Sequence, residues 1–333
     1  MVREIGSEFH RTPMETGSGL SFPGTGALVF SGRTAIETVL KQIPRARKAV
    51  LPSYCCESML DPFLKAGIAV SFYPVEYRDG LQVELRIPGD ADILLWCNYF
   101  GFRTPMPDVS AVRARGGVVI EDITHSLLSD VPCSTQADYY VASVRKWAPV
   151  LCGGYCAAAN GRLHDVPQAL PPEEFLQEKR DAMEQKAAYL ERPDESEKAR
   201  FLARFGESNH WLAENYTALA IDPWSAEWIR KADVQAQREA RRRNARVLYE
   251  GLQGKFPFLF REEEMDCPLF VPIIPENRNE VRQRLTANGI YCPVHWPRPQ
   301  GCQSGLYETE LSLICDQRYS EQDMERILSV LDS

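Results

Sequence analysis

Short apolar runs alternate with segments of helix length between residues 27 and 160 of the chain. Two of the longer segments, residues 34–42 and 57–65, have the length of ordinary helices. Apolar strands separated by helices predict a largely parallel sheet that is covered on both faces. In such sheets ligands bind at the carboxyl ends of the strands, so the loops that follow the strands are the candidate site. The predicted strands are 27–30, 49–52, 69–73, 93–97, 118–121, 139–143 and 154–158.

The pattern becomes polar and helix-rich from Pro171 to about Gly254, with breaks at Pro193 and Pro223. Beyond it the chain predicts a small unit in which strands and helices alternate. We therefore expect a large α/β domain over residues 1–235, with a helical segment at 171–231, and a small carboxy-terminal α+β domain over residues 236–333. The small domain should contain a strand at 268–274, a helix at 277–288, a strand at 311–315 and a closing helix at 320–331.

The composition is that of an ordinary globular protein, with 44% hydrophobic and 25% charged residues among 333. Net charge is −8, and Lys and Arg are dispersed apart from Arg241-Arg242-Arg243, which lies in a helical pattern where a solvated face is expected. No apolar stretch approaches the roughly 20 residues that a membrane span needs. The amino terminus has no apolar core of the kind that a secretory signal requires. The sequence predicts a cytosolic protein with neither a nucleic-acid nor a membrane partner.

The ten cysteines do not form a metal-binding pattern. A structural zinc site is built from two paired knuckles of the CxxC or CxxH kind, and no such pair is present. Several cysteines stand inside apolar runs, among them Cys97 and Cys315, where a free thiol behaves as a small hydrophobe. We therefore expect buried free thiols and no metal site.

Two charged residues stand at the ends of neighbouring predicted strands. Asp122 follows the strand at 118–121, and Lys146 comes three residues after the strand at 139–143. Because both strands belong to one sheet, the two side chains can face a common crevice. A pyridine-ring cofactor requires this pair: an amine forms an imine with its aldehyde, and a carboxylate holds its ring nitrogen protonated.

The surrounding motifs, and above all their order, resemble those of the DegT/DnrJ/EryC1/StrS aminotransferases, also called sugar aminotransferases. In the central stretch a strand runs into Glu121-Asp122-x-x-His125, the next strand runs into Ser143-x-x-Lys146, and Gly153-Gly154-Tyr155 follows. Further segments that resemble the family, in the family's order, are residues 31–35, 51–54, 98–101, 242–244 and 289–296. Together they cover most of the chain.

The resemblance implies a pyridoxal-phosphate-dependent enzyme of the aspartate-aminotransferase-like fold (fold type I), with a mostly parallel seven-stranded sheet. Lys146 would carry pyridoxal 5′-phosphate as a Schiff base and shuttle protons, and Asp122 would pair with the pyridine nitrogen. His125 occupies the place of a family Gln or His near the cofactor's phenolic oxygen.

The phosphate group would bind at the start of the first large-domain helix. The backbone N–H groups of Gly32, Arg33 and Thr34 would cradle it at the helix amino terminus, where the dipole favours an anion. Ser143, three residues before the lysine, would donate to the same group. The resemblance further implies transfer of an amino group from an amino acid, taken to be glutamate, to a keto-sugar or related metabolite in glycan or secondary-metabolite biosynthesis. It also implies a two-fold homodimer.

Three departures from the family pattern concern this site. Cys56 stands where the family has a Phe or Trp that stacks on the cofactor ring, and Tyr54 is the candidate to replace it. The family's Gly-x-Asn-x-Arg segment, which reaches the phosphate from the neighbouring subunit, is not visible around residues 220–228. The stretch from Asp138 to Lys146 is also shorter than in the family.

Simpler explanations exist for each of these side chains. Lys146 beside Arg145 reads as a basic surface turn when taken alone, and Asp122 as a helix cap. His125 has the alternative of a structural histidine. His295 suits a packed turn as well as a substrate contact. Arg318 has the fork geometry to clamp a substrate carboxylate, but a surface ion pair explains it more simply.

Amino transfer has alternatives in other functional classes. A nucleotide-binding dehydrogenase would need a glycine fingerprint after its first strand, and Gly24-Thr25-Gly26 comes before that strand. The stronger alternative is a lyase, an epimerase or a non-transaminating protein of the same fold and cofactor. Relatives that act as sugar dehydratases replace the lysine with His, so Lys146 argues against that branch.

Overall fold

A seven-stranded sheet forms the centre of the molecule, in a computed structural model that describes residues 3–13, 16–87, 89–130 and 133–332. The strand order is β2-β10-β9-β8-β7-β3-β4, and β10 runs antiparallel to both of its neighbours while the other pairs are parallel. The predicted sheet is confirmed, and each predicted strand corresponds to one observed strand. The strands are β2 (Thr25–Val29), β3 (Lys48–Pro52), β4 (Ala69–Tyr73), β7 (Ile93–Cys97), β8 (Val118–Asp122), β9 (Tyr139–Ser143) and β10 (Gly154–Ala158).

The central strands are largely apolar because helices or loops cover both faces of the sheet. All five residues of β7 are buried, and so are all five of β10, as expected for strands buried on both sides. Helix α1 (Gly32–Lys41) packs against β9, β10 and helix α2 (Glu57–Lys65). The β5 (Val75–Tyr77) and β6 (Leu81–Val83) hairpin and the short helix α3 (Ser110–Arg113) complete this part of the chain.

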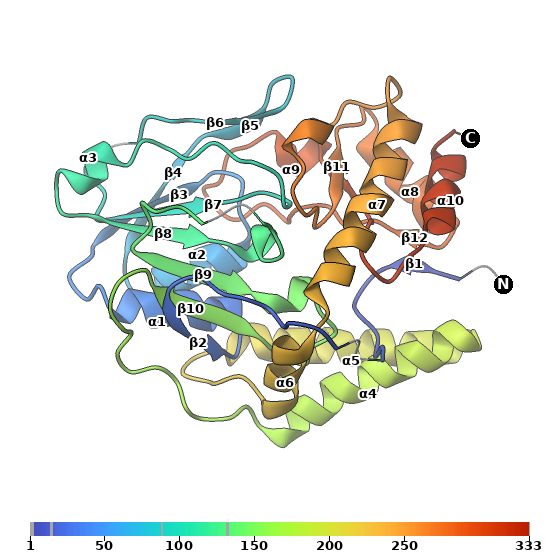
Figure 1. Cartoon of the computed structure of the whole chain (residues 1–333), viewed down its shortest axis with the longest axis horizontal. Helices are drawn as coiled ribbons and strands as arrows, with labels where there is room; N and C mark the ends of the chain where they lie inside the picture. Colours follow the sequence, from blue (N-terminus) through green and yellow to red (C-terminus); the bar gives the residue numbers. More distant parts are fainter. Residues whose placement is uncertain (1–2, 14–15, 88, 131–132, 333) are drawn as a thin grey trace.

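A helical layer follows the sheet in the chain. Helices α4 (Glu173–Glu191) and α5 (Glu195–Glu214) pack against each other, and α6 (Pro223–Lys231) follows them (Figure 1). The breaks lie where the prolines predict them, because Asp194 and Asp222 cap the next helices with their side chains and Pro223 takes the first helical position. Helix α7 (Val234–Leu252) then runs from this layer to the carboxy-terminal elements (Figure 1).

The carboxy-terminal elements form the small α+β unit that the sequence predicts. Strands β11 (Val271–Ile273) and β13 (Leu311–Leu313) pair antiparallel, and helices α8 (Arg278–Ala287), α9 (Leu306–Thr309) and α10 (Glu321–Asp332) surround them. The amino-terminal strand β1 (Ile5–Gly6) also belongs here in space, because it pairs parallel with β12 (Ile290–Tyr291). The domain boundary at residue 235 stays a prediction.

Two further features of the structure concern the cysteines and the hydrophobicity of the helices. All ten cysteines are free, and eight of them are buried, in agreement with the thiols expected from the sequence. Among the described residues, no helix combines the length and the hydrophobicity that crossing a membrane requires.

Candidate active site

A pocket of about 660 Å³ opens where β8 and β9 end and helix α1 begins. The carboxy-terminal unit supplies a second wall through residues 292–296, and the amino-terminal residues Ser7, Glu8 and Phe9 supply a third. The pocket therefore lies at the carboxyl ends of parallel strands, as expected for a ligand site in an open α/β sheet.

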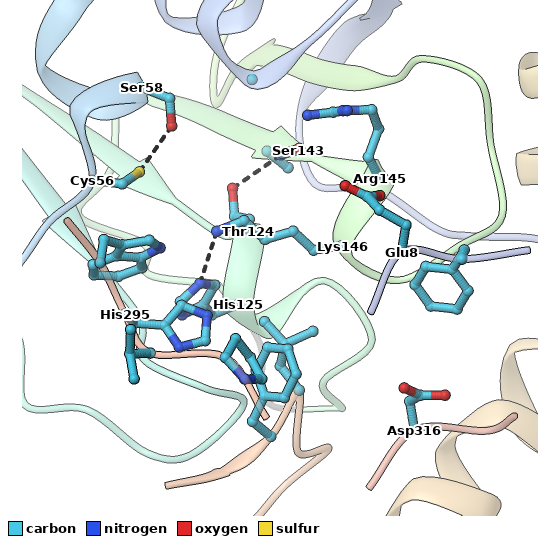
Figure 2. A pocket seen from close by; sticks show the side chains of 18 of the residues that line it. Glu8, Cys56, Ser58, Thr124, His125, Ser143, Arg145, Lys146, His295 and Asp316 are labelled. Atoms are coloured by element: carbon cyan, nitrogen blue, oxygen red, sulfur yellow. Dashed lines mark hydrogen bonds between the residues drawn. The ribbon is translucent and has the colours of Figure 1, made fainter. Parts of the chain in front are cut away.

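Lys146 projects into this pocket from a 3-10 turn (Val144–Lys146) that directly follows β9. Its Nζ lies 3.2 Å from His125 Nε2 (Figure 2). The same atom lies 5.4 Å from the centroid of the Trp296 ring. Lys146 is thus a pocket residue and not part of a surface turn.

Asp122 lies at the end of β8 and lines the same pocket, with 5% of the residue exposed. Burial raises the pKa of its carboxyl, while hydrogen bonds from Thr124 and the charge of Lys146 lower it. Its Oδ1 also accepts the backbone N–H of Thr124 at 2.8 Å, the first residue of the following turn (Thr124–Ser126). Asp122 therefore combines this local hydrogen bond with its position in the pocket.

Glu121, the neighbouring carboxylate, points to the other side of the strand, because side chains alternate along β8. Its Oε1 accepts from Asn98 Nδ2 at 2.9 Å and its Oε2 accepts from Ser134 N at 2.8 Å. Burial raises the pKa of Glu121 to about 7, against these two hydrogen bonds. Of the two acids at this strand end, only Asp122 lines the pocket.

His125 is buried, with 2% of the residue exposed. Burial is the main cause that holds its pKa well below the usual range, followed by the charges of Lys146 and His295, so the imidazole is neutral. Its Nδ1 accepts the backbone N–H of Phe100 at 3.2 Å, which leaves the ring proton on Nε2. The Nε2 side of the His125 ring faces Lys146 Nζ at 3.2 Å.

The amino terminus of α1 provides an anion cradle. Ser31 caps the helix by accepting from Thr34 N at 3.2 Å, and Gly32 and Arg33 line the pocket. A Cβ on Gly32 would lie 3.2 Å from Ser143 Cβ, so glycine lets the helix start approach Ser143 closely. The first turn holds no acidic residue, which suits an anion at this position.

Two of the predicted phosphate contacts have side chains that are engaged elsewhere. The Arg33 guanidinium pairs with Asp61 at 3.2 Å. Thr34 is fully buried, and its hydroxyl donates to the Tyr216 carbonyl at 2.8 Å, outside the pocket lining. The backbone N–H of Thr34 also donates to the Ser31 cap, so this turn has the backbone N–H groups of Gly32 and Arg33 for an anion. Ser143 lines the pocket, and its backbone N–H donates to Thr124 Oγ1 at 3.0 Å (Figure 2).

Tyr54 is fully buried and does not line the pocket. Its hydroxyl donates to Glu310 Oε2 at 3.3 Å, and its ring packs between those of Tyr99 and Trp296. An aromatic ring that does face the pocket is Trp296, which sequence reasoning passed over. Trp296 directly follows His295, a candidate site residue, and this position is the signal in the sequence that could have identified it.

His295 and Arg318 also line the pocket. His295 Nδ1 lies 2.9 Å from Ser312 Oγ, and this contact holds the ring in place at the pocket wall. The ion pair expected for Arg318 exists, but it is buried and not on the surface. Its Nε and Nη2 contact Asp316 at 2.9 and 2.8 Å, and both side chains are 5% exposed.

Cys56 gives a direct chemical test of the pocket. It lines the pocket and is half-buried, whereas Cys133, also half-buried, lies outside this pocket. We expect saturating pyridoxal phosphate to slow alkylation of Cys56 by iodoacetamide about tenfold or more, because only the free protein then reacts. Peptide mapping by mass spectrometry measures both rates. Equal slowing at Cys133, or none at Cys56, would contradict the assignment of the pocket.

The solved structures that match this chain have the fold of the fold-type-I pyridoxal-phosphate-dependent transferases. A putative sugar aminotransferase, Spr1654 from Streptococcus pneumoniae in its PLP form, matches with a TM-score of 0.66 at 12% identity, over 98% of this chain and 97% of that chain. A DegT DnrJ EryC1 StrS aminotransferase from Brucella abortus matches with a TM-score of 0.59 at 16% identity, over 92% and 85%. The sugar aminotransferase CalS13 from Micromonospora echinospora matches with a TM-score of 0.61 at 13% identity, over 92% and 86%.

The chain thus has, over nearly its full length, the fold of the DegT/DnrJ/EryC1/StrS sugar aminotransferases, as its motifs predict. No protein-family model matches the sequence, and no curated protein matches it either. The likeness is one of structure at 12–16% identity.

The residues in the pocket fit pyridoxal phosphate on chemical grounds. A lysine amine, a buried carboxylate and a helix amino terminus are the three groups that this cofactor engages through its aldehyde, ring nitrogen and phosphate. Lys146, Asp122 and the turn at Gly32 supply one each, all within a single cavity.

Proposed function

We propose that this protein is a pyridoxal-phosphate-dependent aminotransferase that moves an amino group from an amino acid, glutamate above all, to a keto-sugar or related metabolite. The observation that supports it most strongly is the shared pocket of Lys146 and Asp122, at the strand ends of this particular fold. The sugar aminotransferases of the same fold support the class of acceptor.

Each residue has a defined task in this proposal. When bound, the cofactor supplies an electron sink that stabilises negative charge at the carbon of the substrate that loses its proton. Lys146 Nζ would hold the cofactor and, once released from it, would carry a proton between the two carbons that exchange one. Asp122 keeps a proton on the ring nitrogen through a charge-assisted hydrogen bond.

The neighbouring groups orient Lys146 and exclude water. The N–H at His125 Nε2 faces Lys146 Nζ, and the Phe100 amide fixes that tautomer. The backbone N–H groups at Gly32 and Arg33, with the hydroxyl of Ser143, would hold the phosphate. Trp296 and His295 close the pocket from the carboxy-terminal side.

Glutamate distinguishes amino transfer from the other reactions of this cofactor. We expect glutamate to convert protein-bound pyridoxal phosphate to pyridoxamine phosphate, with release of one equivalent of 2-oxoglutarate. The absorption spectrum and an assay for the keto acid follow the two products, and Lys146→Ala is the control. A protein that binds the cofactor yet gives neither product with any amino acid would favour a lyase, an epimerase or a non-transaminating role.

The proposed assembly is a two-fold homodimer, as the resemblance implies and as is commonest for soluble oligomers. Sedimentation equilibrium measures it, and an active monomer would contradict it.

A further inference from the structure

The amino-terminal residues 7–9 form a wall of the pocket through contacts to buried cations. Arg318 Nη1 donates to the carbonyl oxygens of Ser7 and Glu8 at 3.3 and 3.1 Å. Lys186 Nζ donates to the carbonyl of Gly6 at 3.2 Å and also to that of Glu8. These bonds fix the backbone, so the Glu8 side chain is directed to the pocket beside Arg145 (Figure 2).

Arg145, Lys179 and Asn209 form a basic cluster around the Glu8 carboxylate. Asn209 Oδ1 accepts from Lys179 Nζ at 3.1 Å and from Arg145 Nη1 at 3.2 Å. Asn209 Nδ2 donates to Glu8 Oε1 at 2.8 Å. Glu8 Oε2 lies 3.8 Å from Lys179 Nζ, which is longer than a hydrogen bond. Two cations thus share one neutral amide oxygen.

The cluster carries more positive than negative charge. Arg145 and Lys179 contribute two positive charges and Glu8 contributes one negative charge, so these three side chains have a net charge of +1. The Lys179 side chain is 3% exposed, and burial lowers its pKa to about 8. Arg145 Nε is buried and finds no hydrogen-bond acceptor in the part of the chain that the structure describes. Buried cations are costly unless an anion pairs with them, so this cluster favours an additional or better-placed anion.

Glu8 is the anion that occupies this cluster in the structure. Burial works to raise the pKa of its carboxyl, but the charges of Lys179 and Arg145 outweigh it and bring the pKa to about 2, so Glu8 is ionised. Its side chain is 42% exposed, toward the pocket. Because the backbone is held separately by Arg318 and Lys186, the side chain can turn away without a backbone movement, and an incoming anion would replace its contacts with Asn209 and Lys179.

We propose that Arg145, Lys179 and Asn209 form an anion-binding subsite of the pocket, in which Glu8 is the resident counter-ion and gives way to a carboxylate or phosphate group of an incoming substrate. Arg145 and Glu8 line the same pocket as Lys146, whereas Lys179 and Asn209 stand behind the Glu8 carboxylate, outside the pocket lining. The identity of that substrate rests on the proposed aminotransferase function, whereas anion binding does not.

Isothermal titration calorimetry tests the subsite with three probes: 2-oxoglutarate, inorganic phosphate and UDP. Pyridoxal phosphate is present at saturation in one series, to occupy the cradle at α1, and absent in the other. Lys179→Met should weaken binding of the recognised probe about tenfold or more, since it removes a charged partner. Glu8→Gln should strengthen it several-fold, because the internal competitor loses its charge. Opposite effects of two neighbouring substitutions are the signature of a displaced counter-ion.

Matched controls use exposed members of other ion pairs. Lys231→Met and Glu184→Gln alter charges of the same kind, in surface pairs with Glu227 and Arg11, and should leave all dissociation constants within about twofold. Should Lys179→Met fail to fold by circular dichroism, Asn209→Asp serves instead, since it places a second carboxylate at the subsite and should also weaken binding.

The outcomes are separable. An effect on 2-oxoglutarate alone assigns the subsite to the carboxylate of an amino donor, and an effect on phosphate and UDP assigns it to a phosphorylated acceptor. The proposal is overturned if Glu8→Gln binds no probe more tightly than the unaltered protein does. Failure of the glutamate reaction would remove the aminotransferase proposal, but would leave these binding constants and their meaning unchanged.

Discussion

Lys146→Ala should abolish amino transfer while the protein still folds. The substitution removes the amine that contacts His125 Nε2 in the pocket, and with it both the cofactor attachment and the proton shuttle. Loss of a positioned acid–base group alone costs about 10²–10⁴-fold in rate, so we expect a fall of at least about 10³-fold. Thermal unfolding should change little, because the lysine side chain lies in a cavity and not in the core. Turnover with glutamate and a melting curve measure the two effects.

Attachment is measured independently of turnover. Borohydride reduction of the cofactor-loaded protein, followed by peptide mapping, should place the pyridoxyl group on Lys146. Lys231→Ala removes a surface lysine that pairs with Glu227, and should leave both the label and the rate unaltered. A label on another lysine would remove the central assignment of this site.

Asp122→Asn should lower turnover, but it should not lower the stability of the cofactor-free protein. Asparagine keeps an acceptor for the Thr124 amide but loses the charge that would hold a proton on the ring nitrogen. We therefore expect the cofactor to bind and turnover to fall by about 10²-fold or more, the scale of one lost charge-assisted contact at a reacting group. Rates under saturating cofactor measure this effect.

The same substitution should leave the stability of the cofactor-free protein unchanged or raise it. Burial raises the pKa of Asp122 above its unfolded value, so the ionised carboxylate lowers the free energy of unfolding as pH rises through the folded pKa. The amide of the variant carries no charge to bury, and Asp122→Asn should therefore melt at an equal or higher temperature at neutral pH. Glu121→Gln is the matched control, because Glu121 faces Asn98 on the opposite side of β8 and should keep its turnover. Near-normal turnover of Asp122→Asn would show that Asp122 has only a structural role, through its hydrogen bond with Thr124.

The sheet could be predicted in detail because its strands are buried on both faces. Such strands are continuous apolar runs, and the helices between them are marked by length and by caps such as Ser31. The predicted run at 93–97 is β7 (Ile93–Cys97) without a shift, whereas the edge strand predicted at 27–30 is β2 (Thr25–Val29). The first two residues of β2, Thr25 and Gly26, are exposed and carry no apolar signal, so the start of this strand is harder to place.

The meeting of Asp122 and Lys146 also followed from sequence, and the family resemblance placed His125 beside them. Neighbouring parallel strands end at the same edge, so residues just beyond β8 and β9 share one crevice. This inference needs only strand order and strand ends. It does not need the direction of any single side chain.

Side-chain direction and long-range contacts were decided by tertiary packing alone. Thr34 and Tyr54 stand beside the predicted site in sequence, yet packing turns their side chains toward Tyr216 and Glu310. Trp296 and Glu8 come to the pocket from opposite ends of the chain. Glu8 arrives because β1 pairs with β12 and because Arg318 is buried against Asp316, and these contacts join the two ends of the chain and leave no periodic or local signal. The sequence by itself thus determined the sheet and the strand-end residues, since both depend on local pattern, and only the folded structure decided which other side chains complete the pocket.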